Sequence, residues 1–259
     1  NSALKQSVFL KNKLRGFSDM SDEVTDANTV LSDILDKRGI SSEAFLSDPG
    51  AQDMFIEKYA GELIDHMTEC SPSGVFMLLC GDSDFLSNTT YRGLFIKDAD
   101  PDSSDDFDTV MTRGSRSVSV HYNIPLDINW ASDFEFSKSD AVKYRFFIEP
   151  VTAARKNPSR KSSYYGYWAD SFVFNDGSNE RIITYSVPLI YEKSVYGVIG
   201  ITLSCSHLSE LLGEDNSERG LVLFSSKKYT DNEDLDGIVQ AMSNISSVKN
   251  VTLGSQIKL

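Results

Sequence analysis

Two short stretches combine aromatic rings with charged side chains, a combination that could bind a small molecule. The first, YRFFIEP, covers residues 144–150, and the second, YYGYWADSF, covers residues 164–172. Pockets for small organic ligands are built from aromatic walls and a few placed polar groups. Arg145 and Asp170 stand among these rings, so each charge must be either exposed or paired. The alternative is that the rings simply fill a core.

Sequence motifs for nucleophilic catalysis and for nucleotide binding are missing. There is no G-x-S-x-G elbow, and the three histidines, His66, His121 and His207, are scattered along the chain. A serine or cysteine nucleophile needs an oriented histidine beside it. Neither glycine-rich phosphate loop pattern is present. We therefore predict no catalytic residue in this chain.

The acidic loop of residues 97–108 starts like a calcium-binding loop. Asp98, Asp100 and Asp102 alternate as its first three ligands would. The match then fails, because Ser103 stands where the sharp turn needs glycine and Thr109 where a glutamate should close the shell. We predict a hydrated surface loop and no metal site, since runs of charge are normally solvated.

The three cysteines do not form a metal-binding pattern. Cys70, Cys80 and Cys205 make neither a C-x-x-C pair nor a cluster with histidine. One disulfide could form, but free cysteines usually behave as small buried apolar side chains, which is the reading we favour. We predict no cofactor.

Charge argues against nucleic acid as a partner. The chain of 259 residues carries 38 acidic and 25 basic side chains, a formal net charge of −13, so a phosphate backbone would be repelled. No apolar run approaches the roughly 20 residues of a membrane span. Because the chain begins with Asn1 rather than Met, we expect it to be a segment of a longer protein.

Hydrophobic periodicity predicts two N-terminal helices followed by a sheet. The first helix, residues 4–37, would be about 50 Å long; the second begins at Asp48-Pro49, an N-cap followed by proline. After them we predict strands at 75–80 and 91–97, a possible strand at 117–122, a helix at 140–149 and a basic loop through Arg155, Lys156, Arg160 and Lys161. Three strands then follow at 164–174, 181–190 and 195–203, and a short helix comes after residue 203. In the tail we predict a strand at 221–225, a helix at 234–242 and a strand at 248–253.

These elements resemble a known family. A long N-terminal helix, an α/β sheet, then YGYWADSF, IITYSVPLIY and VYGVIGITLS are similar to the double Cache (dCache) extracellular sensor domains of bacterial transmembrane receptors; the matching motifs span residues 144–204. The resemblance implies an α+β fold, with a long N-terminal helix, a PAS-like antiparallel sheet with helices and a second, smaller and incomplete α/β module. The implied divisions are residues 1–45 for the signalling and dimerisation helix, 46–212 for the membrane-distal module and 213–259 for part of the membrane-proximal module.

The resemblance also implies a function. The distal module would bind a small molecule on the extracellular face of the bacterial cell membrane, and the chain would form a homodimer through its long helix. The full-length receptor would be anchored in the membrane and carry a diguanylate cyclase, histidine kinase or chemoreceptor output.

Family pockets lie on the sheet, under the preceding helix and loops. The ligand-binding residues that the resemblance implies here are Tyr144, Arg145, Phe147, Tyr167, Trp168, Asp170, Phe172, Tyr185 and Thr202. This sequence departs from the family's amino-acid motif, since Tyr144, Phe146, Phe174 and Thr202 occupy the positions of its Arg, Trp and two Asp residues. Without those carboxylates an α-amino acid would lose its main charge partner. We therefore favour a small carboxylate held by Arg145, or a stacked neutral base.

Two other function classes stay open. The chain could be a secreted or surface binding or adhesion module, which would lack flanking membrane spans. It could also be a carboxylate-dependent hydrolase that uses the acidic loop, although such an enzyme needs two carboxylates placed across a substrate cleft.

Overall fold

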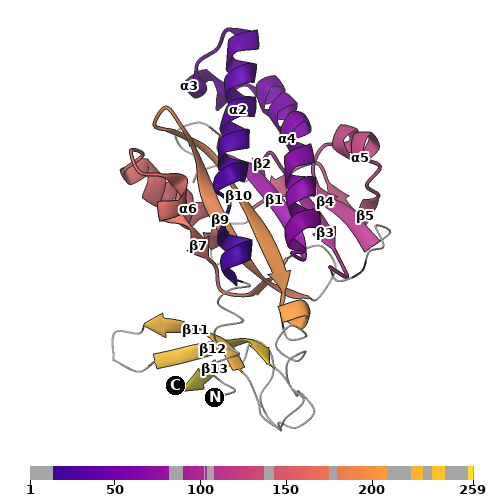
Figure 1. Cartoon of the computed structure of the whole chain (residues 1–259), viewed down its shortest axis with the longest axis vertical. Helices are drawn as coiled ribbons and strands as arrows, with labels where there is room; N and C mark the ends of the chain where they lie inside the picture. Colours follow the sequence, from indigo (N-terminus) through magenta and orange to yellow (C-terminus); the bar gives the residue numbers. More distant parts are fainter. Residues whose placement is uncertain are drawn as a thin grey trace.

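The computed structural model describes residues 14–81, 90–101, 103, 108–136, 143–174 and 180–208, together with the backbone of three later strands. Helices cover both faces of one large sheet (Figure 1). The helices are α2 (Ser21–Arg38), α3 (Ser42–Phe45), α4 (Pro49–Cys70), α5 (Arg116–Tyr122) and α6 (Arg145–Lys156), with the 3-10 helix η3 (Ser162–Tyr165). None of the helices in these described ranges is long and apolar enough to cross a membrane.

The large sheet has eight strands and is almost entirely antiparallel. Its order is β5-β4-β3-β1-β10-β9-β7, with β8 also paired to β9, and only the β4–β5 pair is parallel. Numbered along the chain, the five central strands β3-β1-β10-β9-β7 follow the order 2-1-5-4-3, which is that of a PAS-like sheet. The predicted α+β class is confirmed. The strands are β1 (Gly74–Leu79), β3 (Gly93–Asp98), β4 (Thr109–Arg113), β5 (Leu126–Ala131), β7 (Tyr167–Trp168), β8 (Phe172–Val173), β9 (Arg181–Tyr191) and β10 (Ser194–Ser204).

Two smaller sheets accompany the large one. Strands β2 (Thr90–Tyr91) and β6 (Phe134–Glu135) pair with each other. Strands β11 (Leu223–Tyr229), β12 (Leu235–Met242) and β13 (Gln256–Lys258) form a separate sheet. The predicted helix at 234–242 is therefore wrong, because pairing with β11 and β13 on its two sides holds this segment extended. The strand at 248–253 and the domain division near residue 213 fall outside the described residues and stay predictions.

The alternation of side chains along β1 separates two hydrophobic cores. Val75, Met77 and Leu79 face α2 and α4, whereas Phe76 and Leu78 face α6. Successive side chains of a strand point to opposite faces, so one apolar strand supplies both cores. The sheet is thus a buried middle layer between two helical layers.

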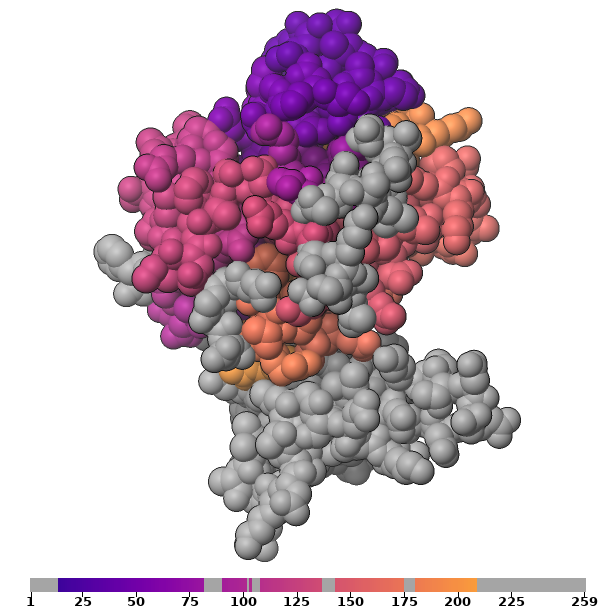
Figure 2. Space-filling view, turned by 180° about the vertical axis from the view of Figure 1, so that it is seen from behind, coloured from indigo at the N-terminus to yellow at the C-terminus, as the bar shows by residue number. Residues whose placement is uncertain are grey.

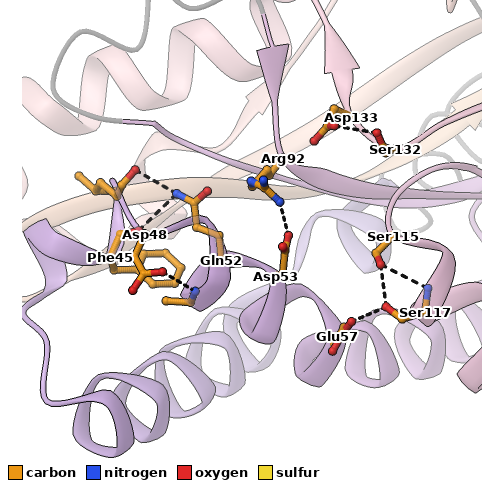
Figure 3. Close-up of polar contacts among 12 residues, drawn as sticks. Phe45, Asp48, Gln52, Asp53, Glu57, Arg92, Ser115, Ser117, Ser132 and Asp133 are labelled. Atoms are coloured by element: carbon orange, nitrogen blue, oxygen red, sulfur yellow. Dashed lines mark hydrogen bonds and ion pairs between the residues drawn. The ribbon is translucent and has the colours of Figure 1, made fainter.

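Helix α4 begins where the sequence predicts. The Asp48 carboxylate accepts a hydrogen bond from the Ala51 N–H at 3.0 Å, and Pro49 takes the first helical position. The Gln52 side-chain amide donates to the carbonyl oxygens of Phe45 at 3.4 Å (Figure 3), Leu46 at 3.1 Å and Cys80 at 3.3 Å. These bonds tie the start of α4 to the end of β1.

The first predicted helix is interrupted. Residues 14–18 are helical, the chain leaves the helix at Asp19 and Met20, and α2 then begins at Ser21. The Ser18 hydroxyl donates to the Arg15 carbonyl at 3.1 Å, and the Ser21 hydroxyl donates to the Asp19 carboxylate at 3.0 Å. Such short side chains compete with the helical backbone bonds, which explains the break. The part of the prediction before residue 14 lies outside the described residues.

Two other sequence predictions need correction. The possible strand at 117–122 is helix α5, capped by the Ser115 hydroxyl and ended by Asn123 in the left-handed conformation. Its alternating VSVHY pattern resembles a strand, but the caps at both ends favour a helical turn. The first strand of the predicted meander, 164–174, is instead η3 followed by the two-residue strands β7 and β8.

Helix α6 continues through a proline. The helix predicted at 140–149 starts at Arg145, and it reaches Lys156, so Arg155 and Lys156 are helical rather than part of a basic loop. Pro150 has no N–H to donate to the carbonyl of Phe146. The Ser186 hydroxyl of β9 donates to that carbonyl at 2.5 Å instead. This bond satisfies the carbonyl that the proline leaves open and joins α6 to the sheet.

The three cysteines form no disulfide with one another. Cys80 and Cys205 are buried, as the sequence predicts, whereas Cys70 is partly exposed. Burial raises the pKa of the Cys80 thiol to about 12 and that of Cys205 to about 11. Within the described ranges no group of His, Cys, Asp and Glu side chains could hold a metal ion.

A buried ion pair joins α2 to α4. Glu23 and His66 approach to 2.5 Å, with their side chains 15% and 4% exposed. Burial by itself raises the pKa of the Glu23 carboxyl. Hydrogen bonds from His66 and from the backbone, together with the electrostatic attraction of His66, lower this pKa by more than burial raises it. The net result is a pKa below the ordinary value of 4.5. The pair therefore stabilises the fold above that ordinary value, and the stabilisation is lost as pH falls through the folded-state pKa.

We expect the free energy of unfolding to fall between about pH 5 and pH 3 in the wild type, and more gently in Glu23→Gln. Urea unfolding at several pH values would measure both slopes. The control is Asp33→Asn, since Asp33 forms only an exposed pair with Lys37. Equal slopes for wild type and Glu23→Gln would contradict the assigned role of the pair.

Candidate ligand-binding site

A cavity of about 230 Å³ opens on the α6 side of the sheet. Its walls come from the end of β4, from β5 and β6, from the start of α6 and from β8. Figure 2 views this side: the surface of residues 108–136 lies on one side and that of α6 on the other. We call this space the outer cavity. Its lining residues include Arg113, Asp133, Phe134, Glu135, Lys143, Tyr144, Phe172 and Phe174.

A second, smaller space lies against the sheet itself. This inner cavity, of about 10 Å³, is lined by six phenylalanines and by Ile182, Thr184 and Thr202. Phe134, Phe172 and Phe174 line both cavities, so these three rings stand between them. The remaining three are Phe76, Phe95 and Phe146.

Charged groups of both signs belong to the outer cavity. The Arg113 guanidinium lies over the Phe174 ring at 5.4 Å and donates to the carbonyls of Thr112 at 2.6 Å and Asn129 at 3.0 Å. These bonds hold the cation at the cavity wall. The Asp133 carboxylate accepts from the Ser132 hydroxyl at 2.7 Å, on the turn between β5 and β6 (Figure 3).

The rim at the start of α6 is rigid. The Tyr144 ring stacks on Phe136 with centroids 3.7 Å apart, and its hydroxyl donates to the Glu135 carbonyl at 3.2 Å. Both rings are buried. Tyr144 thus joins the short strand β6 to α6, and a ligand would meet a preorganised aromatic wall.

Four of the predicted site residues lie at or beside the cavities. Tyr144 lines the outer cavity, Thr202 the inner one, and Phe172 lines both. Phe147 is fully buried in the same core and packs against Tyr91 at 4.9 Å. It supports the cavity wall rather than lining it.

Three predicted residues, Arg145, Tyr167 and Asp170, lie outside the lining of either cavity. Burial raises the pKa of the Tyr167 hydroxyl, Glu149 and Asp170 raise it further, and Arg145 lowers it. The charged groups of the aromatic stretches are therefore not among the residues that line the cavities.

Trp168 and Tyr185 lie on the opposite face of the sheet. They are cross-strand partners on β7 and β9, with ring centroids 5.0 Å apart. Tyr185 belongs to the core under α2, and Trp168 is 36% exposed. Because alternate residues of a strand point to opposite faces, Trp168 points away from the side of its neighbour Tyr167.

Sequence reasoning missed the cationic residues of the outer cavity and Thr184 of the inner cavity. Arg113 and Lys143 carry no local motif, and only the fold brings them to one cavity. Thr184 had a usable signal: with Ser186 it places hydroxyls at alternate positions of an otherwise apolar strand. Polar residues on one face of a buried strand need partners on that face.

Searches of known protein families and of curated proteins found no match. The solved structures that match this chain include the ligand-binding domain of the Campylobacter jejuni chemoreceptor Tlp3 in complex with 4-methylisoleucine, at 12% identity and a TM-score of 0.39, covering 85% of this chain and 67% of that one. The periplasmic sensory domain of C. jejuni Tlp1 is 11% identical, with a TM-score of 0.35 and coverages of 85% and 70%. The extracellular domain of a protein described as a histidine kinase, soHK1S-Z6, is 14% identical, with a TM-score of 0.38 and coverages of 84% and 69%. These structures are described as a ligand-binding domain, a periplasmic sensory domain and an extracellular domain, respectively.

Proposed function

We propose that this chain is the extracellular ligand-binding domain of a bacterial transmembrane sensor of the double Cache type. The observation that carries the proposal is the pair of cavities on the PAS-like sheet. The inner cavity contains buried hydroxyls that have no hydrogen-bond partner in the described part of the chain, and the outer cavity has charged residues at its wall. A packed protein core rarely contains buried hydroxyls without hydrogen-bond partners, whereas a ligand-binding site uses such polar groups to hold and orient its ligand.

The ligand is a small metabolite with a flat or branched apolar body. A volume of about 230 Å³ is below the usual range for drug-sized ligands. The phenylalanine walls suit such a body, and Arg113 and Lys143 suit a carboxylate. We thus keep the small carboxylate as the favoured class, with Arg113 in the role that the sequence suggested for Arg145. Because Asp133 and Glu135 also line the cavity, apolar amino acids belong in any screen.

The sheet connects the cavities to α2. β9 and β10 carry Thr184 and Thr202 on the cavity face. On the other face the Asn28 side chain of α2 donates to the Ile190 carbonyl of β9 at 3.1 Å and accepts from the Tyr196 hydroxyl of β10 at 3.0 Å. A ligand that binds one sheet arrangement better than another would therefore move α2.

The wider architecture belongs to the same proposal. We infer a homodimer through the N-terminal helix, anchoring of the full-length chain in the cell membrane, and a cytoplasmic output that is a diguanylate cyclase, a histidine kinase or a chemoreceptor signalling domain. Cross-linking of cysteines placed along the exposed face of α2, with and without ligand, would test the transfer of signal. Identical cross-linking patterns would count against it.

A thermal-shift screen tests ligand binding. We expect a small carboxylate or an apolar amino acid to raise the melting temperature, by about 2.7 kcal/mol of stabilisation at a hundredfold excess over Kd. Arg113→Ala should abolish the shift, and Arg145→Ala, which changes a similar side chain outside the cavities, should keep it. The proposal fails if carboxylates, amino acids, bases, amines and sugars all leave the melting temperature unchanged.

A further inference from the structure

Two threonine side chains on neighbouring strands line the inner cavity, and the described residues offer no hydrogen-bond partner to either hydroxyl. Thr184 on β9 and Thr202 on β10 are direct cross-strand neighbours. Their side chains are buried, with 1% and 2% exposed, and neither hydroxyl has a partner among the described residues. Both line the inner cavity.

The next hydroxyls along the same strands are satisfied. Ser186, two residues after Thr184, donates to the Phe146 carbonyl at 2.5 Å. Ser204, two residues after Thr202, accepts from the His207 N–H at 3.0 Å. On these two strands, the hydroxyls of Ser186 and Ser204 are paired, whereas those of Thr184 and Thr202, which line the cavity, have no partner among the described residues, which points to a partner from outside the chain.

Size and charge restrict that partner. The inner cavity is lined by phenylalanines, one isoleucine and the two threonines, with no charged residue, so a charged group would lose its hydration without compensation. A volume of about 10 Å³ suits a group the size of one water molecule. One uncharged oxygen, from a hydroxyl or a carbonyl, fits both the volume and the two threonine hydroxyls.

The outer cavity, at the other end of the site, has two cationic residues, Arg113 and Lys143, beside Asp133 and Glu135 in its lining. Phe134, Phe172 and Phe174 separate the inner cavity from the outer one, and the Arg113 guanidinium lies over Phe174. A molecule that extends between the cavities would place a flat body among these three rings. Its far end would meet Arg113 and Lys143.

We propose that Thr184 and Thr202 form hydrogen bonds with an uncharged oxygen at one end of an aromatic carboxylate, and that the carboxylate group at its other end binds Arg113. The ligand class is thus an aromatic acid with a hydroxyl or carbonyl opposite its carboxylate. This inference rests on the proposed function of the cavities as a ligand site. The competing account is that the two hydroxyls hold one buried water, in which case they would not affect ligand choice.

Calorimetric titration of the purified chain with 4-hydroxyphenylacetate and phenylacetate tests the proposal. The wild type should bind the hydroxylated acid about tenfold more tightly, the value of roughly one net hydrogen bond to a buried group. In Thr184→Val/Thr202→Val, which keeps the side-chain shape, this preference should disappear while phenylacetate binds at least as well.

A matched control is Thr112→Val, because Thr112 is an equally buried threonine whose hydroxyl donates to the Phe95 carbonyl at 3.4 Å. It should keep the preference. The single variants Thr184→Val and Thr202→Val give the same readout if the double variant does not fold.

Equal affinity of the wild type for both acids, or a preference that survives in the double variant, would overturn the inference and favour the buried water. Failure of both acids to bind would overturn the aromatic-acid class. Either failure is distinct from failure of the proposed function, because a hit from another compound class that Arg113→Ala abolishes would still support a ligand site.

Discussion

Replacing Tyr196 by alanine should lower the free energy of unfolding by about 3–5 kcal/mol, the range for loss of a large buried aromatic side chain. Tyr196 is fully buried on the α4 side of β10. Its ring meets Phe45 and Phe55 edge-on, with centroids 6.1 and 5.6 Å away. Its hydroxyl donates to Asn28 of α2 at 3.0 Å. One side chain therefore joins three helices to the sheet.

Urea unfolding would separate the two contributions of Tyr196. Tyr196→Phe keeps the ring and loses only the hydrogen bond to Asn28, so we expect a loss of about 1 kcal/mol. Tyr164→Ala removes an exposed ring of the same type and should change stability by less than about 1 kcal/mol. A loss in Tyr196→Ala no greater than that in Tyr164→Ala would contradict the central position of Tyr196 in the core.

Replacing Gly200 by alanine should lower the free energy of unfolding by about 3 kcal/mol, at the upper end of the usual cost of overpacking. A Cβ atom at this position would lie 2.1 Å from the Tyr185 carbonyl oxygen and 2.5 Å from Cζ of Phe76. The first contact is with backbone of the neighbouring strand, which cannot rotate away. The second is with a ring that lines the inner cavity, so ligand binding should weaken as well.

Gly16 supplies the control for Gly200. It lies in the helical residues 14–18, and a Cβ there would have nothing within 4 Å. Gly16→Ala should therefore stabilise the chain by about 0.5–1 kcal/mol, because alanine favours a helix over glycine. Equal and small effects of the two substitutions would contradict the close strand packing at Gly200.

Helix ends with local chemical signals were predictable from the sequence. The capping carboxylate of Asp48 and the fixed backbone of Pro49 act within one turn, and they place the start of α4 correctly. The continuation of α6 past Pro150 was not predictable. It depends on the Ser186 hydroxyl, which is 40 residues from the Phe146 carbonyl that it satisfies.

The aromatic stretches supply rings to the cavities but not their charged groups. Tyr144, Phe146 and Phe172 line the cavities, as does Thr202 from outside these stretches. Arg145, the charge closest to these rings in sequence, does not line them, and Arg113 does. Proximity along the chain does not determine the face of a sheet or helix to which a side chain points.

By itself, the sequence determined the α+β class, the long apolar strands β9 and β10 with their hairpin, and the resemblance to extracellular sensors. Those features rest on composition, on periodicity and on short motifs, all of which act over a few residues. Only the tertiary structure decided which rings form a cavity and that Trp168 and Tyr185 lie on the other face. It also decided that Thr184 and Thr202 are cross-strand neighbours whose hydroxyls have no hydrogen-bond partner within the described ranges. The reason is physical: the register between strands determines which distant side chains meet, and a shift of one residue would reverse the face of each.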